Sequence, residues 1–376
     1  MKTLVVEKSK IRANLEVIQE QAGKAQVIAV LKANAYGLGL LEMAGLCREA
    51  GIRRFAVTEP EEAVRLRDWG FGEEEILVLR STADEGEIKK ILQAGATATV
   101  GSYDAALALN GLAESQGMMC DVHVKVDTGM GRYGFLPTEI DRILSVYRYL
   151  ANLNVTGTYT HYANAFKSVK KTQEQLDAFN NLVEKIRAAG FEPGMLHASN
   201  SEAMFGCKMP NLDAVRIGSA LGGRVIAKGD HGLQRTGKLQ SQITEVRWLP
   251  KGSPVGYGSV YVTKHPTRVA VVPVGSADGY MLEKTRTSAR FRDCIRAACA
   301  SLLGIIRKKR YYVLVNGKRA RSSAMWVSTT PPSTSPISSA HPAPPFIWMR
   351  RPSMCPPPFP GNILTDLIEI HIDLIV

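Results

Sequence analysis

The chain has 376 residues, of which 45% are hydrophobic and 22% are charged. This length exceeds what one ordinary core supports, and it predicts a large domain of about 250 residues followed by a second domain. No apolar run approaches the roughly 20 residues of a membrane span, and no apolar signal segment follows Met1. A membrane protein is therefore excluded, and a cytoplasmic location is expected.

The formal net charge of +12 raises nucleic acid as a partner. Much of the excess lies between Lys284 and Arg321, without the regular interleaving of aromatic side chains that stacks bases. We interpret this segment as a solvated basic surface and expect no nucleic-acid partner. The six cysteines lack the paired spacing of a disulfide framework or a zinc site, so no metal is expected.

A helix is predicted over residues 11–22, and from residue 27 a short apolar run is repeatedly followed by an amphipathic stretch of helical period. Such alternation predicts parallel strands with right-handed crossovers, and eight units close into a barrel. The predicted strands are 27–31, 54–57, 76–79, 97–100, 121–126, 155–160, 194–197 and 213–217, and helices between them include 61–67, 85–92, 103–114 and 171–188.

After about residue 235 the alternation stops, and β-rich runs follow at 239–248, 258–262, 268–274 and 311–315. Of the 19 prolines, 11 lie between Pro331 and Pro360, where they can supply neither ladder donors nor helix turns. We therefore predict a barrel over 1–235, a partial β domain over 236–320, and a Pro/Ser-rich, disordered tail over 321–376.

Residues 30–39, VLKANAYGLG, place Lys32 at the C-terminal end of the first predicted strand, where barrel active sites form. A lysine there can form a Schiff base, although taken alone it is more often a surface lysine. The string resembles the cofactor-binding motif of the alanine racemases. The resemblance implies that Lys32 carries pyridoxal 5'-phosphate (PLP) and that Tyr36 contacts its phosphate.

Five further motifs resemble those of the same family and occur in the same order. Residues 125–132, KVDTGMGR, imply that Arg132 contacts the phenolic oxygen of PLP and the substrate carboxylate, and Thr160-His161 implies that His161 packs behind the pyridine ring. The family modifies the lysine matching Lys125 to a carbamate that orients this arginine. The phosphate-holding motifs are matched by HASNS and VRIGS, which contribute Asn200, Ser201, Arg216, Gly218 and Ser219. Ser201 opens a helical turn whose dipole favours an anion.

The sixth motif, Pro254-Val255-Gly256-Tyr257-Gly258, resembles the loop that carries a second catalytic base. PLP delocalises the carbanion left by removal of the α-proton, and racemisation needs a base on each face. The resemblance implies Lys32 on the D face and Tyr257 on the L face, with the tyrosine supplied by the partner subunit of a homodimer. Taken alone, Tyr257 is more often a tyrosine in a glycine-flanked turn.

The resemblance also places the guanidinium of Arg216 against the pyridine nitrogen of PLP. Because arginine stays protonated, that nitrogen remains unprotonated and the ring is a weaker electron sink. A carbanion is then reprotonated at once, which favours racemisation over transamination. Without the motif, a salt-bridged surface arginine is the alternative.

The sequence thus predicts an α/β protein with an N-terminal PLP-binding (β/α)8 TIM barrel and an incomplete, mainly β C-terminal domain. The expected activity is interconversion of L- and D-alanine, which supplies D-alanine for peptidoglycan. Two alternatives stay open: a racemase of serine or broader amino acids on the same fold, and a catalytically impaired PLP-binding relative.

Two departures from the family concern the C-terminal part. Ser276 replaces the tyrosine usual at a substrate-entrance position, and after residues 313–320 the family's Cys-Met-Asp motif and a later phosphate-binding tyrosine do not appear. Codons for residues 321–339 can be chosen so that a neighbouring frame reads VFGHVGIDHTTVDVTDIQ, which contains a Gly-Ile-Asp variant of that motif. We therefore hypothesise a frameshift near Arg321, with reduced dimer stability and activity.

Overall fold

The computed structural model describes residues 2–256, 259, 261–275 and 278, together with the strands 311–315, 318–322, 346–348 and 367–370. The chain divides into two compact units, one of residues 7–236 and one of residues 1–6 and 237–376. No helix in the described part is long and apolar enough to cross a membrane.

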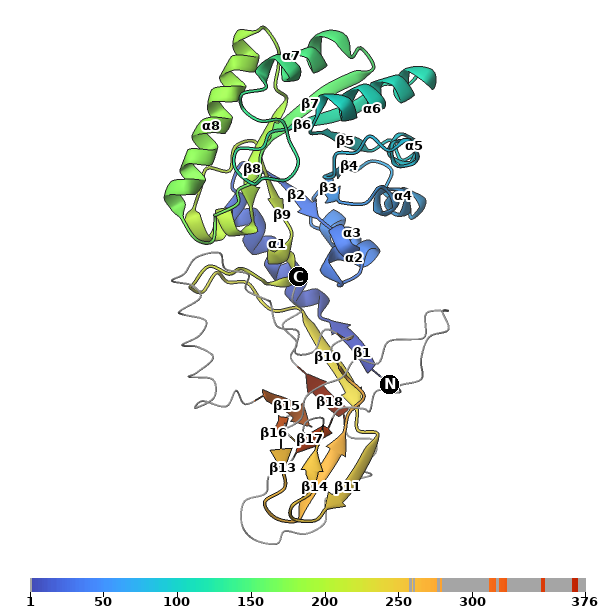
Figure 1. Cartoon of the computed structure of the whole chain (residues 1–376), viewed down its shortest axis with the longest axis vertical. Coiled ribbons are helices and arrows are strands. Elements are labelled where there is room, and N and C mark those ends of the chain that lie inside the picture. Colours follow the sequence, from blue (N-terminus) through green and yellow to red (C-terminus); the bar gives the residue numbers. More distant parts are fainter. Residues whose placement is uncertain are drawn as a thin grey trace. The chain divides into compact units, whose positions relative to one another are not determined.

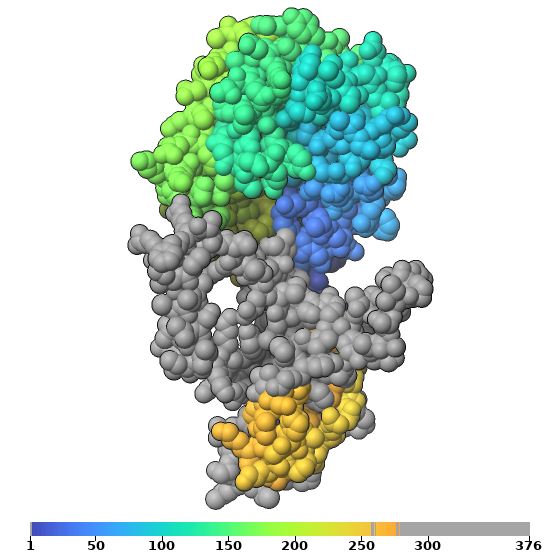
Figure 2. Space-filling model, viewed as in Figure 1, coloured from blue at the N-terminus to red at the C-terminus, as the bar shows by residue number. Residues whose placement is uncertain are grey.

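The unit of residues 7–236 is a closed barrel of eight parallel strands with helices outside, which confirms the predicted (β/α)8 fold (Figure 1). The last strand pairs with the first, with Ile28 opposite Arg216. In Figure 2 the colours run in chain order around the surface of this unit, because successive β/α units lie side by side. Its strands are β2 (Gln26–Val30), β3 (Arg54–Val57), β4 (Glu75–Val78), β5 (Thr97–Val100), β6 (Cys120–Lys125), β7 (Leu153–Tyr159), β8 (Met195–Asn200) and β9 (Ala214–Ile217).

Three helices of the barrel unit begin at a residue whose side chain caps the helix. Asp84, Ser102 and Ser168 each accept a hydrogen bond from a backbone amide of the helix that they precede. The helices are α1 (Lys8–Ala22), α3 (Leu40–Glu49), α4 (Pro60–Asp68), α5 (Glu85–Gln93), α6 (Tyr103–Ser115), α7 (Ile140–Tyr149) and α8 (Val169–Ala188), with short turns α2 (Lys32–Tyr36), η1 (Ala203–Cys207) and η2 (Ser219–Gly222).

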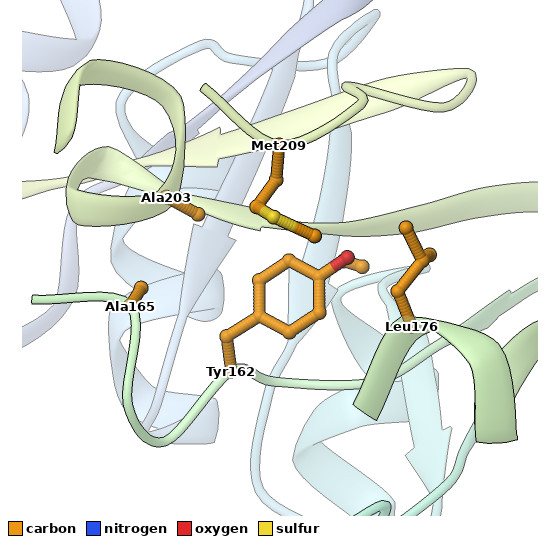
Figure 3. Packing of buried hydrophobic residues seen from close by; sticks show 6 residues of the cluster. Tyr162, Ala165, Leu176, Ala203 and Met209 are labelled. Carbon is orange, nitrogen blue, oxygen red and sulfur yellow. The ribbon is translucent and has the colours of Figure 1, made fainter. Parts of the chain in front are cut away.

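Apolar side chains of the parallel strands are buried, as in other sheets covered on both faces. One buried cluster joins β2, β3, β4 and β9 through Ile28, Val30, Ala56, Leu77 and Ala214. A second cluster lies beyond β7 and β8, where Figure 3 shows the ring of Tyr162 facing Met209 and Leu176. Burial of each such large side chain contributes about 1.5–3 kcal/mol, so these clusters fix the strand ends that they join.

The second unit contains an antiparallel sheet in the order β1-β10-β18-β15-β16-β17-β14-β11, which agrees with the predicted β domain. The strand Lys2–Val6, which lies within the range predicted for the barrel domain, pairs here with Gly237–Gln242. The strands are β1 (Lys2–Val6), β10 (Gly237–Gln242), β11 (Glu245–Leu249), β14 (Thr267–Val271), β15 (Tyr311–Val315), β16 (Lys318–Ser322), β17 (Phe346–Trp348) and β18 (Leu367–Ile370), beside the two-stranded pair β12 (Pro254–Val255) and β13 (Tyr261–Val262).

Two segments of the predicted disordered tail, β17 and β18, are therefore paired strands. FIW is a short apolar run, and three of the four residues of LIEI are apolar, so both segments are compatible with short strands, although prolines precede FIW closely. Most of the tail, together with Tyr257 and Ser276, lies outside the described residues.

Candidate active site

The predicted site residues of the barrel unit lie at or just after the C-terminal ends of its strands. Lys32 follows β2, Arg132 follows β6, His161 follows β7, and Gly218 follows β9. Parallel strands present these ends at one face of the barrel, so the structure brings the residues together. Tyr257 lies outside the described residues.

Lys32 begins a turn of unusual backbone geometry. Ala33, Asn34, Ala35 and Tyr36 have φ values of 53°, 55°, 53° and 57°, in the left-handed region. Each such residue costs about 1–2 kcal/mol for an L-amino acid that is not glycine, so the surroundings must hold the turn. The amide of Ala35 donates to Leu31 O at 2.7 Å, and the amide of Asn34 donates to Oε1 of Glu62 at 3.0 Å.

The turn brings Tyr36 against the chain after β9. A Cβ atom at Gly218 would lie 2.1 Å from the Tyr36 hydroxyl oxygen, so this approach requires glycine. Oγ of Ser201 accepts hydrogen bonds from the amides of Gly218 at 3.2 Å and Ala220 at 3.4 Å. Because Oγ is the acceptor in both bonds, the Ser201 hydroxyl keeps its hydrogen for another partner. Tyr36 and Ser201 thus form a cluster of hydroxyl donors suited to an anion.

Arg216 is 3% exposed and holds several strand ends together. Its terminal nitrogens donate to the carbonyl oxygens of Thr160 at 2.7 Å, His197 at 3.0 Å and Ala198 at 3.1 Å. Nη2 also lies 3.3 Å from Nδ1 of His161. Burial lowers the pKa of Arg216 to about 10, so the guanidinium remains protonated at neutral pH.

A chain of side-chain contacts runs from Arg216 through two histidines for which the sequence predicted no role. Nη1 of Arg216 lies 2.7 Å from Nδ1 of His197, and Nε2 of His197 lies 2.9 Å from Nδ1 of His123. Nε2 of His123 then lies 3.7 Å from Oε1 of Glu75. The sequence carried one signal for this chain of contacts: His123 and Lys125 are two residues apart on β6 and therefore lie on the same face of the strand.

Burial sets the charge of these histidines. Burial, together with the positive charges of Arg54 and Arg216, lowers the pKa of His123 to about 3. It also lowers the pKa of His197 and of His161 well below the ordinary value, again assisted by Arg216. All three rings are therefore neutral at physiological pH. Asn200 contacts the same region, since its side-chain nitrogen lies 3.5 Å from Nε2 of His161.

The loop that carries Arg132 is organised by a carboxylate that the sequence analysis quoted without assigning it a role. The carboxylate of Asp127 accepts hydrogen bonds from the backbone amides of Gly129 at 2.9 Å, Met130 at 2.7 Å and Arg132 at 2.9 Å. Burial opposes ionisation of Asp127, but these backbone hydrogen bonds outweigh it and lower its pKa. The charged carboxylate therefore fixes the backbone position from which Arg132 extends.

Two lysines lie in this positive environment. Burial first, and then repulsion from Arg132 and Arg216, lower the pKa of Lys125 to about 7. The pKa of Lys32 is also lowered, first by burial and then by Arg132, while Glu62 acts in the opposite direction. Both amines consequently reach their neutral, nucleophilic form more readily than a surface lysine does.

The sequence matches two family models. The alanine racemase N-terminal domain model covers residues 6–224, and the alanine racemase C-terminal domain model covers residues 236–325. The chain belongs to the alanine racemase family.

Individual relatives agree with this assignment. The chain is 36% identical to alanine racemase of Methanococcus maripaludis over 283 residues, which cover 73% of this chain and 75% of that protein. It is 35% identical to alanine racemase of Carboxydothermus hydrogenoformans, covering 72% and 74% respectively. Among solved structures, alanine racemase of Clostridium difficile 630 shares 25% identity with a TM-score of 0.78, covering 98% of this chain and 86% of that one.

One further solved structure shows the same fold at lower identity. Alanine racemase of Bartonella henselae with covalently bound pyridoxal phosphate is 22% identical, with a TM-score of 0.75, and the match covers 98% of this chain and 90% of that one.

PLP, the cofactor of the alanine racemases, fits the donors of this site. An aldehyde needs an amine that becomes neutral readily, and the half-buried Lys32 favours that form because burial and Arg132 lower its pKa. A phosphate needs donors, and Tyr36 and Ser201 offer hydroxyls beside Gly218. A ring nitrogen that is to stay unprotonated needs a permanent donor, and Arg216 remains charged.

Proposed function

We propose that this chain interconverts L- and D-alanine with PLP held at the C-terminal end of its barrel. The observation that carries the proposal is the environment of Lys32, whose pKa is lowered by burial and Arg132 within a barrel that also fixes a charged Arg216. Lys32 would hold the aldehyde carbon, and Tyr36, Asn200, Ser201, Gly218 and Ser219 would hold or support the phosphate.

When bound, PLP supplies an electron-accepting ring that acidifies the α-proton of an attached amino acid. Arg132, whose backbone is fixed by Asp127, binds the substrate carboxylate and directs the α-carbon toward Lys32. The neutral Lys32 amine takes the α-proton on the D face, and a second base returns a proton on the opposite face. Arg216 stays protonated near neutral pH, so it would donate to the ring nitrogen of PLP, keep that nitrogen unprotonated and disfavour transamination.

For the second base we propose Tyr257, supplied by the partner subunit of a cytoplasmic homodimer. A mixture of two inactive variants tests both the residue and the assembly. We expect Lys32→Ala and Tyr257→Phe each to lose racemisation, and their mixture to regain part of it after subunit exchange. A heterodimer then contains one site with both bases intact. A mixture as inactive as its components would contradict the shared site.

Exchange of the α-proton in D2O tests the assignment of each base to a face. We expect Tyr257→Phe to retain exchange with D-alanine and to lose exchange with L-alanine, because Lys32 still acts on the D face. Equal loss with both enantiomers would refute this assignment. Turnover of L-serine, measured in parallel with the unsubstituted chain, separates an alanine racemase from one of broader specificity.

We also propose that the reading frame changes near Arg321. The C-terminal domain match ends at residue 325, just beyond that position, and the expected Cys-Met-Asp motif is missing. The nucleotide sequence tests this directly. A neighbouring frame without β-domain-like sequence would overturn the proposal.

A further inference from the structure

The carboxylate of Glu62 joins two segments that follow different barrel strands. Glu62 lies in the first turn of α4, after β3, and is 8% exposed. Its Oε1 accepts the amide of Asn34, in the turn after β2, at 3.0 Å. Its Oε2 accepts the amides of Thr58 at 3.3 Å and Glu59 at 3.4 Å. One buried side chain therefore caps its own helix and also reaches across to the neighbouring loop.

The segment held by Glu62 is the left-handed turn that directly follows Lys32. Asn34 is the second of four consecutive non-glycine residues with positive φ. Its side chain also takes part, since Oδ1 accepts the amide of Leu40 at 3.0 Å. For L-amino acids other than glycine this conformation carries a free-energy cost, which accumulates over the four residues. A charge-assisted hydrogen bond from Asn34 to Glu62 offsets part of this cost and selects the strained conformation.

Glu62 also places a negative charge among positive groups. Arg132 lowers the pKa of Lys32, whereas Glu62 raises it. Lys125 and His161 interact electrostatically with Lys32 as well, and the ring of Tyr36 lies 5.7 Å from its Nζ. Glu62 therefore opposes the combined effect of burial and Arg132 on the amine.

We infer that Glu62 is a positioning residue for Lys32, because its carboxylate fixes the left-handed turn that directly follows the lysine and adds a negative charge to the surroundings of the amine. The inference deepens the proposed function and rests on Lys32 as the reactive lysine. It assigns to Glu62 two separable effects, one on backbone geometry and one on the protonation of Lys32.

Two substitutions separate these effects in the full chain freed of cofactor. Glu62→Gln keeps the side-chain length and an acceptor oxygen but removes the charge. Glu62→Asp keeps the charge but is too short to reach Asn34. The matched control is Glu61→Gln, since Glu61 is the exposed neighbour that pairs with Lys90. Glu59→Ala disturbs the start of α4 without touching Asn34, and so controls for loss of helix stability.

Protonation of Lys32 is measured from the pH dependence of its acylation by acetic anhydride, by peptide mass spectrometry with exposed Lys170 as internal reference. We expect the midpoint to move to lower pH in Glu62→Gln and to stay in place in Glu61→Gln and Glu59→Ala. Backbone geometry is measured from hydrogen exchange across residues 33–37, which we expect to accelerate in Glu62→Asp more than in Glu59→Ala.

A Glu62→Gln midpoint equal to that of Glu61→Gln, together with unchanged exchange in Glu62→Asp, would overturn the inference. If Glu62→Gln does not fold, the exchange of Glu62→Asp still decides the geometric part. Both readouts are taken without PLP or alanine. A chain that fails to racemise alanine yet shows both shifts would refute the proposed function and leave the role of Glu62 intact.

Discussion

Nη1 of Arg216 donates a 2.7 Å hydrogen bond to Nδ1 of the buried His197. A guanidinium cannot accept a hydrogen bond, so Nδ1 must be unprotonated and the proton of the neutral ring lies on Nε2. That proton is directed to Nδ1 of His123, 2.9 Å away, and the proton of His123 then faces Glu75. Arg216 thereby sets the tautomers of two histidines, and these in turn hold its orientation.

Replacing His123 should show how much the hydrogen bonds of these histidines contribute to the free energy of unfolding. In His123→Phe the Nε2 hydrogen of His197 loses its acceptor in a buried position, which costs about 1–3 kcal/mol. We expect the free energy of unfolding in urea to fall by that amount. His231→Phe, at a half-buried position away from Arg216, is the control. Equal stability of the two variants would show that the histidine contacts contribute nothing to the fold.

Stability should depend on pH through Lys125. The pKa of Lys125 is lowered to about 7 in the folded chain from an ordinary value of 10.5. Between these values the unfolded chain binds more protons than the folded chain, so the contribution of Lys125 to the free energy of unfolding rises with pH. We expect the stability of the unsubstituted chain, relative to Lys125→Met, to increase between pH 7 and 10. A constant difference would contradict the lowered pKa.

The neutral form of Lys125 should also react with carbon dioxide, as the family resemblance implies. A carbamate forms only on an unprotonated amine, and burial makes that form accessible near neutral pH. We expect carbon-13 NMR in labelled bicarbonate to show a bound carbamate carbon in the full chain, with loss of the signal in Lys125→Ala. A signal that persists in this variant would place the carbamate elsewhere.

The contact between Gly218 and Tyr36 should control cofactor affinity. A Cβ at position 218 would lie 2.1 Å from the Tyr36 hydroxyl oxygen, so Gly218→Ala must displace that side chain. Overpacking of this kind costs about 1–3 kcal/mol, and we expect the Kd for PLP to rise by roughly tenfold or more. Gly111→Ala is the matched control, because its Cβ meets nothing within 4 Å in α6. Unchanged affinity in Gly218→Ala would exclude Tyr36 as a phosphate ligand.

Restoring the proposed reading frame after Arg321 should raise activity. The β domain carries Tyr257 and would contribute to dimer stability, so an in-frame C-terminal part is expected to increase both. We expect the restored chain to racemise alanine markedly faster and to remain dimeric at lower concentration, as measured by turnover and light scattering. Equal activity of both versions would show that residues 321–376 serve as well as the family's own sequence.

The sequence by itself determined the barrel and the identity of most residues at its mouth. In a barrel of parallel strands, short apolar runs alternate along the chain with amphipathic stretches of helical period, and both patterns are visible in the local sequence. Motifs such as that of Lys32 lie at strand ends, so their positions follow from this pattern. Short strands among prolines, such as β17, were missed because their pairing partners lie far along the chain.

Only the tertiary structure decided how the proposed site residues are held. The left-handed turn after Lys32 depends on Glu62, and the orientation of Arg216 depends on His197 and His123, each from another strand or helix. The strand Lys2–Val6 likewise joins the second unit by pairing with β10. Hydrogen bonds and charges that join distant segments leave no periodic trace in sequence, because their energy depends on distances that exist only after folding.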